Sequence, residues 1–123
     1  MNKLVQSTRR PDITFARSGK IDIFARAARL LNLAKGDIIN IAKIDNEYML
    51  FVQLRASEAV GRHSCACYPT KSTGRHFRLN SVALCNEIRA LVDTPADRVS
   101  FGIGYPIDFE GTVMLPIITK RPL

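Results

Sequence analysis

Tryptophan is absent from the sequence, cysteine occurs only three times, and no apolar run is long enough to cross a bilayer. A membrane-spanning helix needs about 20 consecutive apolar residues, so we expect no membrane partner. Three cysteines cannot all pair with one another, and no apolar leader segment precedes them, which favours a reducing, cytoplasmic location. Acidic residues are also few, with 11 Asp and Glu against 18 Lys and Arg.

The resulting net charge of +7 is distributed unevenly along the 123 residues. Residues 1–35 carry eight Lys and Arg against two acidic residues, residues 36–61 two against four, and residues 62–123 eight against five. A basic cluster attracts polyanions such as nucleic acids, although a basic surface is also common on small soluble domains. The excess toward the N-terminus makes duplex DNA the first partner to consider.

The signatures of enzymes and cofactor sites are missing or incomplete. Gly102 and Gly104 lack the third glycine and the following helix of a dinucleotide-binding loop, and residues 72–75 lack the Lys-Ser/Thr order of a phosphate-binding loop. His63 and His76 have no serine or cysteine at the spacing of a nucleophilic motif. We therefore expect a protein that is not an enzyme and that needs no cofactor.

Apolar alternation and turn residues predict two successive units, each of the form strand, strand, helix, strand, strand. The first unit covers residues 12–53, with strands at 12–16, 20–23, 38–44 and 48–53 and a helix at 25–33. The second unit covers residues 63–119, with strands at 64–68, 75–79, 98–103 and 112–119 and a helix at 82–92. The remaining segments are expected to be a flexible basic tail at 1–11, a connection at 54–62 and a C-terminal tail at 120–123.

The two units align with each other as an internal repeat. Gly19-Lys20 aligns with Gly74-Arg75, and Asp37 with Asp97, at matching turns where an aspartate side chain can hold the backbone. A unit of half this chain buries little surface alone, so the two are expected to share one core. The predicted fold is mainly β with two short helices, arranged as a pseudo-twofold β-barrel of two β-β-α-β-β repeats.

The first unit also carries a family motif. Gly19-Lys20 precedes alternating aliphatic residues, a short helix with Arg26 and Arg29, Leu31-Asn32-Leu33, and Gly36-Asp37. In this order of elements, residues 12–52 resemble the swapped-hairpin DNA-binding domain of the AbrB/SpoVT/MraZ superfamily. The resemblance implies that the barrel is of swapped-hairpin type and that the chain is a bacterial transcriptional regulator. The second unit is degenerate and resembles the family only through the repeat.

The candidate DNA contacts are basic residues of the hairpins and helices: Arg17, Lys20, Arg26, Arg29, Arg75, Arg78 and Arg89. The resemblance implies Lys20 and Arg29, whereas strand and helix phase add Arg17 and Arg26. Each would neutralise a backbone phosphate and release counterions. The alternative is a non-enzymatic protein-interaction module, antitoxin-like or a mobile-element accessory protein, whose basic surface is incidental. A homodimer also stays open, because the contact between units can equally form between two chains.

Five residues have metal-binding chemistry: His63, Cys65, Cys67, His76 and Cys85. On a strand, Cys-x-Cys puts both thiols on one face, where they serve equally well as small buried hydrophobes. Structural zinc sites more often use Cys-x2-Cys with a paired second half. We therefore predict no metal site.

Overall fold

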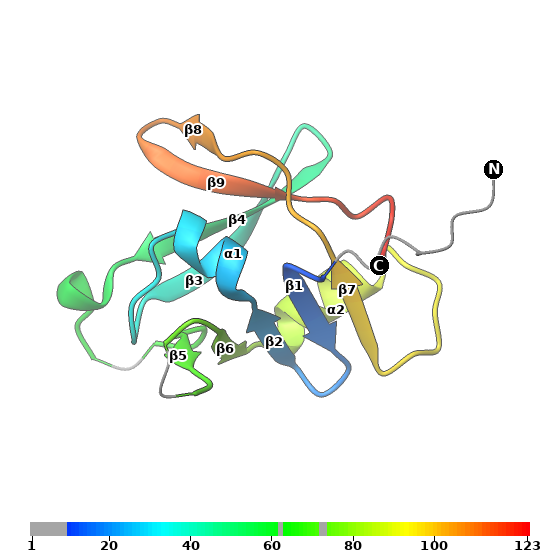
Figure 1. Ribbon diagram of the computed structural model, residues 1–123, viewed down its shortest axis with the longest axis horizontal. Coiled ribbons are helices and arrows are strands. Elements are labelled where there is room, and N and C mark those ends of the chain that lie inside the picture. Colours follow the sequence, from blue (N-terminus) through cyan, green and yellow to red (C-terminus); the bar gives the residue numbers. More distant parts are fainter. Residues whose placement is uncertain (1–9, 62, 72–73) are drawn as a thin grey trace.

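The computed structural model describes residues 10–61, 63–71 and 74–123, which form two antiparallel sheets and two α-helices (Figure 1). One sheet has the order β5-β6-β2-β1-β7, built from β1 (Ile13–Ala16), β2 (Lys20–Ile23), β5 (Tyr68–Pro69), β6 (Phe77–Asn80) and β7 (Arg98–Phe101). The other has the order β3-β4-β9-β8, built from β3 (Ile38–Ile44), β4 (Glu47–Leu54), β8 (Ile107–Phe109) and β9 (Thr112–Ile117). The helices are α1 (Ala25–Leu30) and α2 (Val82–Arg89), and a 3-10 turn covers Ala56–Glu58.

The β1–β2 hairpin turns at Gly19, which sits directly against the start of α2. Gly19 has φ +101°, and a Cβ at this position would lie 2.9 Å from Cγ2 of Val82. Its carbonyl accepts a hydrogen bond from the Ser81 amide at 2.8 Å, and Ser81 in turn caps α2 by accepting from the Leu84 amide at 3.1 Å. Glycine is therefore required at this turn both for its backbone conformation and for space.

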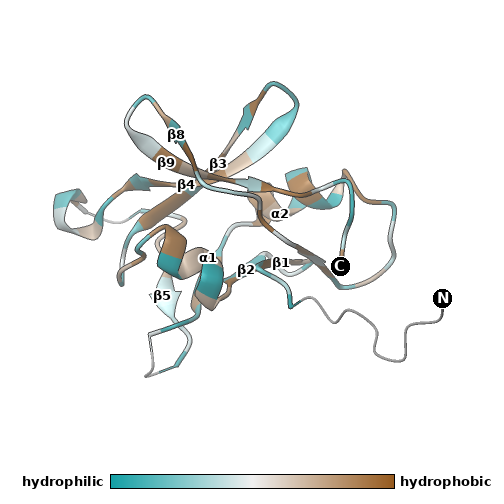
Figure 2. Cartoon of the chain, turned by 45° about the horizontal axis from the view of Figure 1, so that its top comes forward, coloured by the Kyte–Doolittle hydropathy of each residue, from teal (hydrophilic) through white to brown (hydrophobic). Residues whose placement is uncertain are grey.

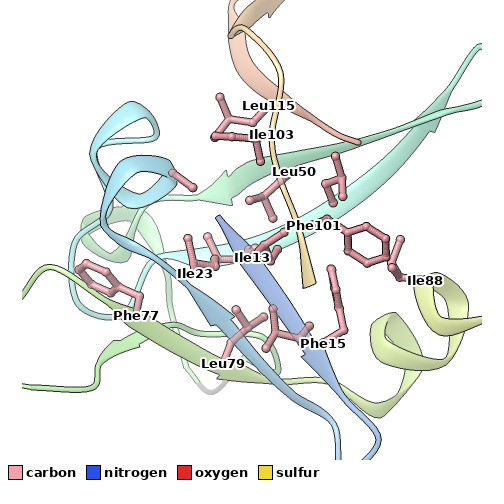
Figure 3. Packing of buried hydrophobic residues seen from close by; sticks show 14 of the residues in the cluster. Ile13, Phe15, Ile23, Leu50, Phe77, Leu79, Ile88, Phe101, Ile103 and Leu115 are labelled. Carbon is pink, nitrogen blue, oxygen red and sulfur yellow. The ribbon is translucent and has the colours of Figure 1, made fainter. Parts of the chain in front are cut away.

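The main core lies between the two sheets, with the helices at its ends (Figure 3). Side chains that are fully buried come from both predicted units, and the largest include Phe15, Ile21, Leu50, Phe101 and Leu115. The helices contribute little area: α1 buries Ala27 and Ala28, and α2 buries Cys85 and Ile88. Figure 2 shows hydrophilic and hydrophobic segments alternating along α1, so that one side of this short helix packs and the other is exposed.

The predictions of a mainly β fold and two short helices are confirmed, but a closed barrel is not found among the described residues. Outside the named strands, the sheets are linked by isolated bridges, Ile38 with Ala66 and Ile103 with Ile117. Neither bridge extends into a ladder of paired residues, so the two sheets are not joined into a closed barrel in the part of the chain that the structure describes. Cys65, beside the first bridge, has φ +69°, and β7 ends just before Gly102 and Ile103.

Other predicted elements also differ from the structure, among them the helix expected at 82–92, which ends at Arg89. The strand expected at 64–68 is reduced to β5, because the left-handed backbone at Cys65 interrupts extended structure. The helix expected at 25–33 ends at Leu30, just before the left-handed Asn32, which has φ +52°. The segment 104–111, between the strands expected at 98–103 and 112–119, contains β8, which pairs with β9 through a tight hairpin whose Glu110 and Gly111 both have positive φ.

No helix in the described part of the chain is long and apolar enough to cross a membrane.

The three cysteines are free thiols that differ in burial. Burial raises the pKa of Cys67 to about 12, with a smaller contribution from the Asp37 carboxylate, and burial also raises the pKa of Cys85. Only a thiolate reacts readily with a disulfide reagent, so at about pH 8 these two thiols stay protonated and shielded.

We expect Ellman's reagent, used at about pH 8, to label native protein rapidly at Cys65 alone, and to label all three thiols after denaturation. Absorbance of the released thiolate measures the count. Cys65→Ser is the control and should remove the rapid phase. A rapid phase that persists in this variant would contradict the burial of Cys67 and Cys85.

Candidate nucleic-acid interface

Helix α1 presents two arginines to solvent on the side opposite its packed residues. Arg26 and Arg29 are three positions apart and therefore neighbours on the helix surface, whereas Ala27 and Ala28 face the core. The small alanine side chains let the helix lie close to the sheets. The packed face of α1 therefore fixes the helix in place, and the two arginine side chains extend from it into solvent.

Two adjoining hollows border α1 and bring basic residues together from both halves of the chain. One, of about 550 Å³, lies between α1 and the residues that lead into β6; its lining includes Arg29, Gly74 and Arg75. The other, of about 650 Å³, is lined by residues that include Arg10, Arg26 and Arg29. Ala25 and Arg29 line both hollows, so the two hollows are neighbours on the surface. We call Arg10, Arg26, Arg29 and Arg75 the α1 basic surface.

A buried carboxylate fixes one of these arginines. Asp12 is nearly inaccessible; its Oδ2 accepts the Ile103 amide at 2.9 Å and Nη1 of Arg26 at 3.0 Å. The pair holds the Arg26 guanidinium at the base of the helix and leaves its remaining N–H groups for other acceptors. Within residues 10–61, 63–71 and 74–123, the side chains of Arg10, Arg29 and Arg75 make no hydrogen bond or ion pair.

The other predicted contacts of the first unit lie elsewhere. Arg17 and Lys20 border a hollow of about 460 Å³ at the β1–β2 turn, at the opposite end of β2 from α1, together with Arg98. Arg17 donates to the Pro95 carbonyl at 2.7 Å and lies 3.5 Å from the Asp97 carboxylate. The sequence motif therefore separates in space into two basic regions, and Arg98 was not among the predicted residues.

Two predicted contacts are engaged within the protein. Arg78 donates from Nε and Nη2 to the two carboxylate oxygens of Asp22, at 2.6 and 3.2 Å across the β2–β6 pair. These hydrogen bonds and the Asp22 charge raise the pKa of Arg78. Arg89 donates to the carbonyls of Ala96 and Asp97, at 2.7 and 3.2 Å, and so ties the end of α2 to the following loop. Both side chains have structural partners that a phosphate would have to displace or share.

Arg55, which the sequence did not single out, organises the end of α1. Its guanidinium donates to the carbonyls of Leu31 and Asn32 and to Oδ2 of Asp37, each at 2.9 Å. Asp37 also accepts the amides of Ala34 and Ala56, both at 2.9 Å. Arg55 therefore ties the two residues that follow α1 to the turn at Asp37.

The prediction that Asp37 holds its turn is confirmed by these bonds. The same prediction for Asp97 is wrong, because its side chain is 87% exposed and only approaches Arg17. The turn at Asp97 is held instead by the Asp97 backbone carbonyl. This carbonyl accepts hydrogen bonds from the backbone amide of Arg17, at 2.8 Å, and from a side-chain N–H of Arg89. The two turns are therefore held by different chemistry.

Comparison with known proteins gives no matching family model, curated protein or solved structure. The functional argument for this chain therefore rests on its own residues and their geometry.

The histidines and cysteines do not gather into a metal site in the described residues, where no three His, Cys, Asp or Glu side chains come together. His63 instead lies with Nε2 3.0 Å from the Val60 carbonyl. His76 packs edge to face against Phe24, with ring centroids 5.4 Å apart, and lines the larger hollow beside α1.

Proposed function

We propose that this chain is a DNA-binding protein, a bacterial transcriptional regulator of swapped-hairpin type, that grips duplex DNA with the α1 basic surface. The observation that carries the proposal is the convergence of Arg10, Arg26, Arg29 and Arg75 on adjoining hollows. Among the described residues that line either hollow, Asp12 is the one acidic side chain, and it is buried and paired with Arg26. Such a surface attracts phosphate groups and presents little negative charge that would repel them.

The strand order supports the swapped-hairpin part of the proposal. β2 lies beside β6 and β4 beside β9, so strands at equivalent places in the two predicted units pair with each other, antiparallel. β1 and β5 then flank the first pair, and β3 and β8 flank the second. The inner strand pairs therefore follow a pseudo-twofold arrangement, whereas β7, the predicted counterpart of β3, lies beside β1 in the first sheet.

On DNA, the arginines would act mainly by position and charge. Arg29 and Arg75 come from different units and border the same hollow, so they can contact phosphates on either side of it. Arg26, held by Asp12, would add a contact whose geometry is fixed before binding. Phosphate contacts set orientation and affinity, and they carry no sequence information directly.

The double substitution Arg29→Ala with Arg75→Ala is expected to weaken binding to labelled duplex DNA of mixed sequence. Each lost phosphate contact reduces the slope of log K against log salt by about 0.9, so the slope should fall by about 1.8. Fluorescence anisotropy at several salt concentrations measures it.

The matched control removes two positive charges elsewhere: Lys43→Ala with Lys120→Ala. Both lysines are exposed and line neither hollow beside α1. This control should leave the slope within about 0.5 of the parent, because distant charges are screened at these salt concentrations. Equal slopes for the two double variants would overturn the assignment of the α1 basic surface.

The alternative function, a protein-interaction module, has one specific observation in its favour. Large apolar side chains are exposed around β8 and β9: Tyr105, Ile107, Phe109 and Val113. Exposed apolar patches of this kind often mark protein contacts. A chain that shows no retention on duplex DNA at low salt, while Phe109→Ser abolishes binding to a defined partner protein, would favour this alternative over the regulator.

A further inference from the structure

The larger hollow beside α1 combines an aromatic wall with a cationic rim. Its wall includes Phe24 and His76, which contact each other edge to face, and its rim includes Arg10, Arg26 and Arg29. Its volume of about 650 Å³ falls in the range of sites for single small molecules, about 300–1,000 Å³. Phosphate contact alone would require the cations but not the rings.

The polar groups around this hollow have unused hydrogen-bonding capacity. Nδ1 of His76 is buried and has no hydrogen-bond partner among the described residues. Buried polar atoms normally have one, so the His76 ring keeps an unsatisfied nitrogen close to the hollow that it lines. Arg26 uses one N–H on Asp12, and the side chain of Arg29 uses none within the described ranges.

We propose that this hollow binds a mononucleotide, with its base against Phe24 and His76 and its phosphate between Arg26 and Arg29. A nucleobase has a flat apolar face that can pack against the two rings. A phosphate matches the fork of an arginine guanidinium. Because Arg26 and Arg29 also belong to the α1 basic surface, a bound nucleotide occupies two of the groups assigned to duplex DNA. The nucleotide site itself does not depend on DNA binding.

Isothermal titration calorimetry of the full chain with AMP, adenosine and inorganic phosphate tests the proposal. If the base and the phosphate both contribute to binding, AMP should bind at least about tenfold more tightly than adenosine or phosphate alone. Stacking of one base contributes about 1–3 kcal/mol. Equal affinity for AMP and phosphate would mean a plain anion site and would overturn the proposal, as would equal affinity for AMP and adenosine.

Substitutions test which residues contact the base and which contact the phosphate. Phe24→Leu keeps apolar bulk but removes the ring, and it should weaken AMP about tenfold while leaving phosphate affinity unchanged. Phe24→Tyr keeps the ring and should retain AMP affinity. Arg29→Ala should weaken both AMP and phosphate. The matched control is Lys43→Ala, at an exposed position outside both hollows beside α1, which should change neither. Loss of AMP binding in the Lys43 variant equal to that in the Arg29 variant would overturn the site.

Two further arms separate this proposal from the DNA-binding function. A chain that binds duplex DNA but not AMP overturns the nucleotide site and leaves the proposed regulator standing. A chain that binds AMP but not duplex DNA overturns the proposed regulator and leaves the nucleotide site standing. Binding of single-stranded DNA by a chain that does not bind free AMP would mean that the hollow takes a strand and would overturn the nucleotide site.

Discussion

Phe101→Ala is expected to lower the free energy of unfolding by about 3–5 kcal/mol, the range for truncating a buried aromatic side chain. Phe101 is fully buried on β7 and contacts the ring of Phe15 edge to face, with centroids 5.9 Å apart (Figure 3). It pairs in register with Ile13 of β1. The substitution therefore opens a cavity where the first and second halves of the chain meet, and urea unfolding followed by circular dichroism measures the loss.

Two further variants make this prediction specific. Phe101→Leu should cost less than the alanine variant, because it leaves a smaller cavity, and it keeps the chain folded if the alanine variant is too unstable to measure. Tyr105→Ala, four residues along, removes an aromatic side chain that is 88% exposed and should change stability by less than about 0.5 kcal/mol. If all three variants unfold alike, Phe101 is not at the centre of a core that both halves share.

Much of the fold was predictable from local patterns. The strand predicted at 38–44 has these bounds in the structure, because its β-branched residues lie between glycine and Asp-Asn turn signals. Two of the errors fall at Cys65 and Asn32, where a non-glycine residue adopts left-handed backbone. Asparagine adopts this conformation more readily than most residues, whereas nothing in residue type marks Cys65, where tertiary contacts decide the conformation.

The site was predictable in its residue types but not in its grouping. Helical spacing places Arg26 and Arg29 together, and alignment of the repeat singled out Arg75. The ion pair between Arg78 and Asp22 depends on the register of β2 with β6, a contact between residues 56 positions apart. No spacing rule on the sequence reveals which charges such a pairing neutralises.

The role of Arg55 was hidden for the same reason. It lies in the segment predicted to be a plain connection, and its partners are 18 to 24 positions away in the sequence. Its effect on function is indirect: by holding the carbonyls of Leu31 and Asn32, it fixes the end of the helix that carries Arg26 and Arg29.

Asp37→Ala is expected to lower the free energy of unfolding by about 3 kcal/mol. The Asp37 side chain is 2% exposed and accepts three hydrogen bonds of 2.9 Å, from two backbone amides and from Arg55. Each buried donor left without a partner costs about 1–3 kcal/mol. Arg55 is 42% exposed, so water recovers part of its loss and the total stays below the simple sum. Thermal unfolding should show a decrease in Tm of roughly 10 °C.

Asp97→Ala is the matched control, because Asp97 occupies the aligned turn of the second unit. Its exposed carboxylate only approaches Arg17, at 3.5 Å, so the loss should stay below about 0.5 kcal/mol. Asp37→Asn should fall between the two, because an amide keeps one acceptor oxygen but turns an NH2 group toward a donor. If loss of the buried carboxylate also frees the end of α1, Asp37→Ala should weaken duplex binding at temperatures where the chain is still folded, while Asp97→Ala should not. Similar stability losses at the two aspartates would contradict the hydrogen-bonded role assigned to Asp37 alone.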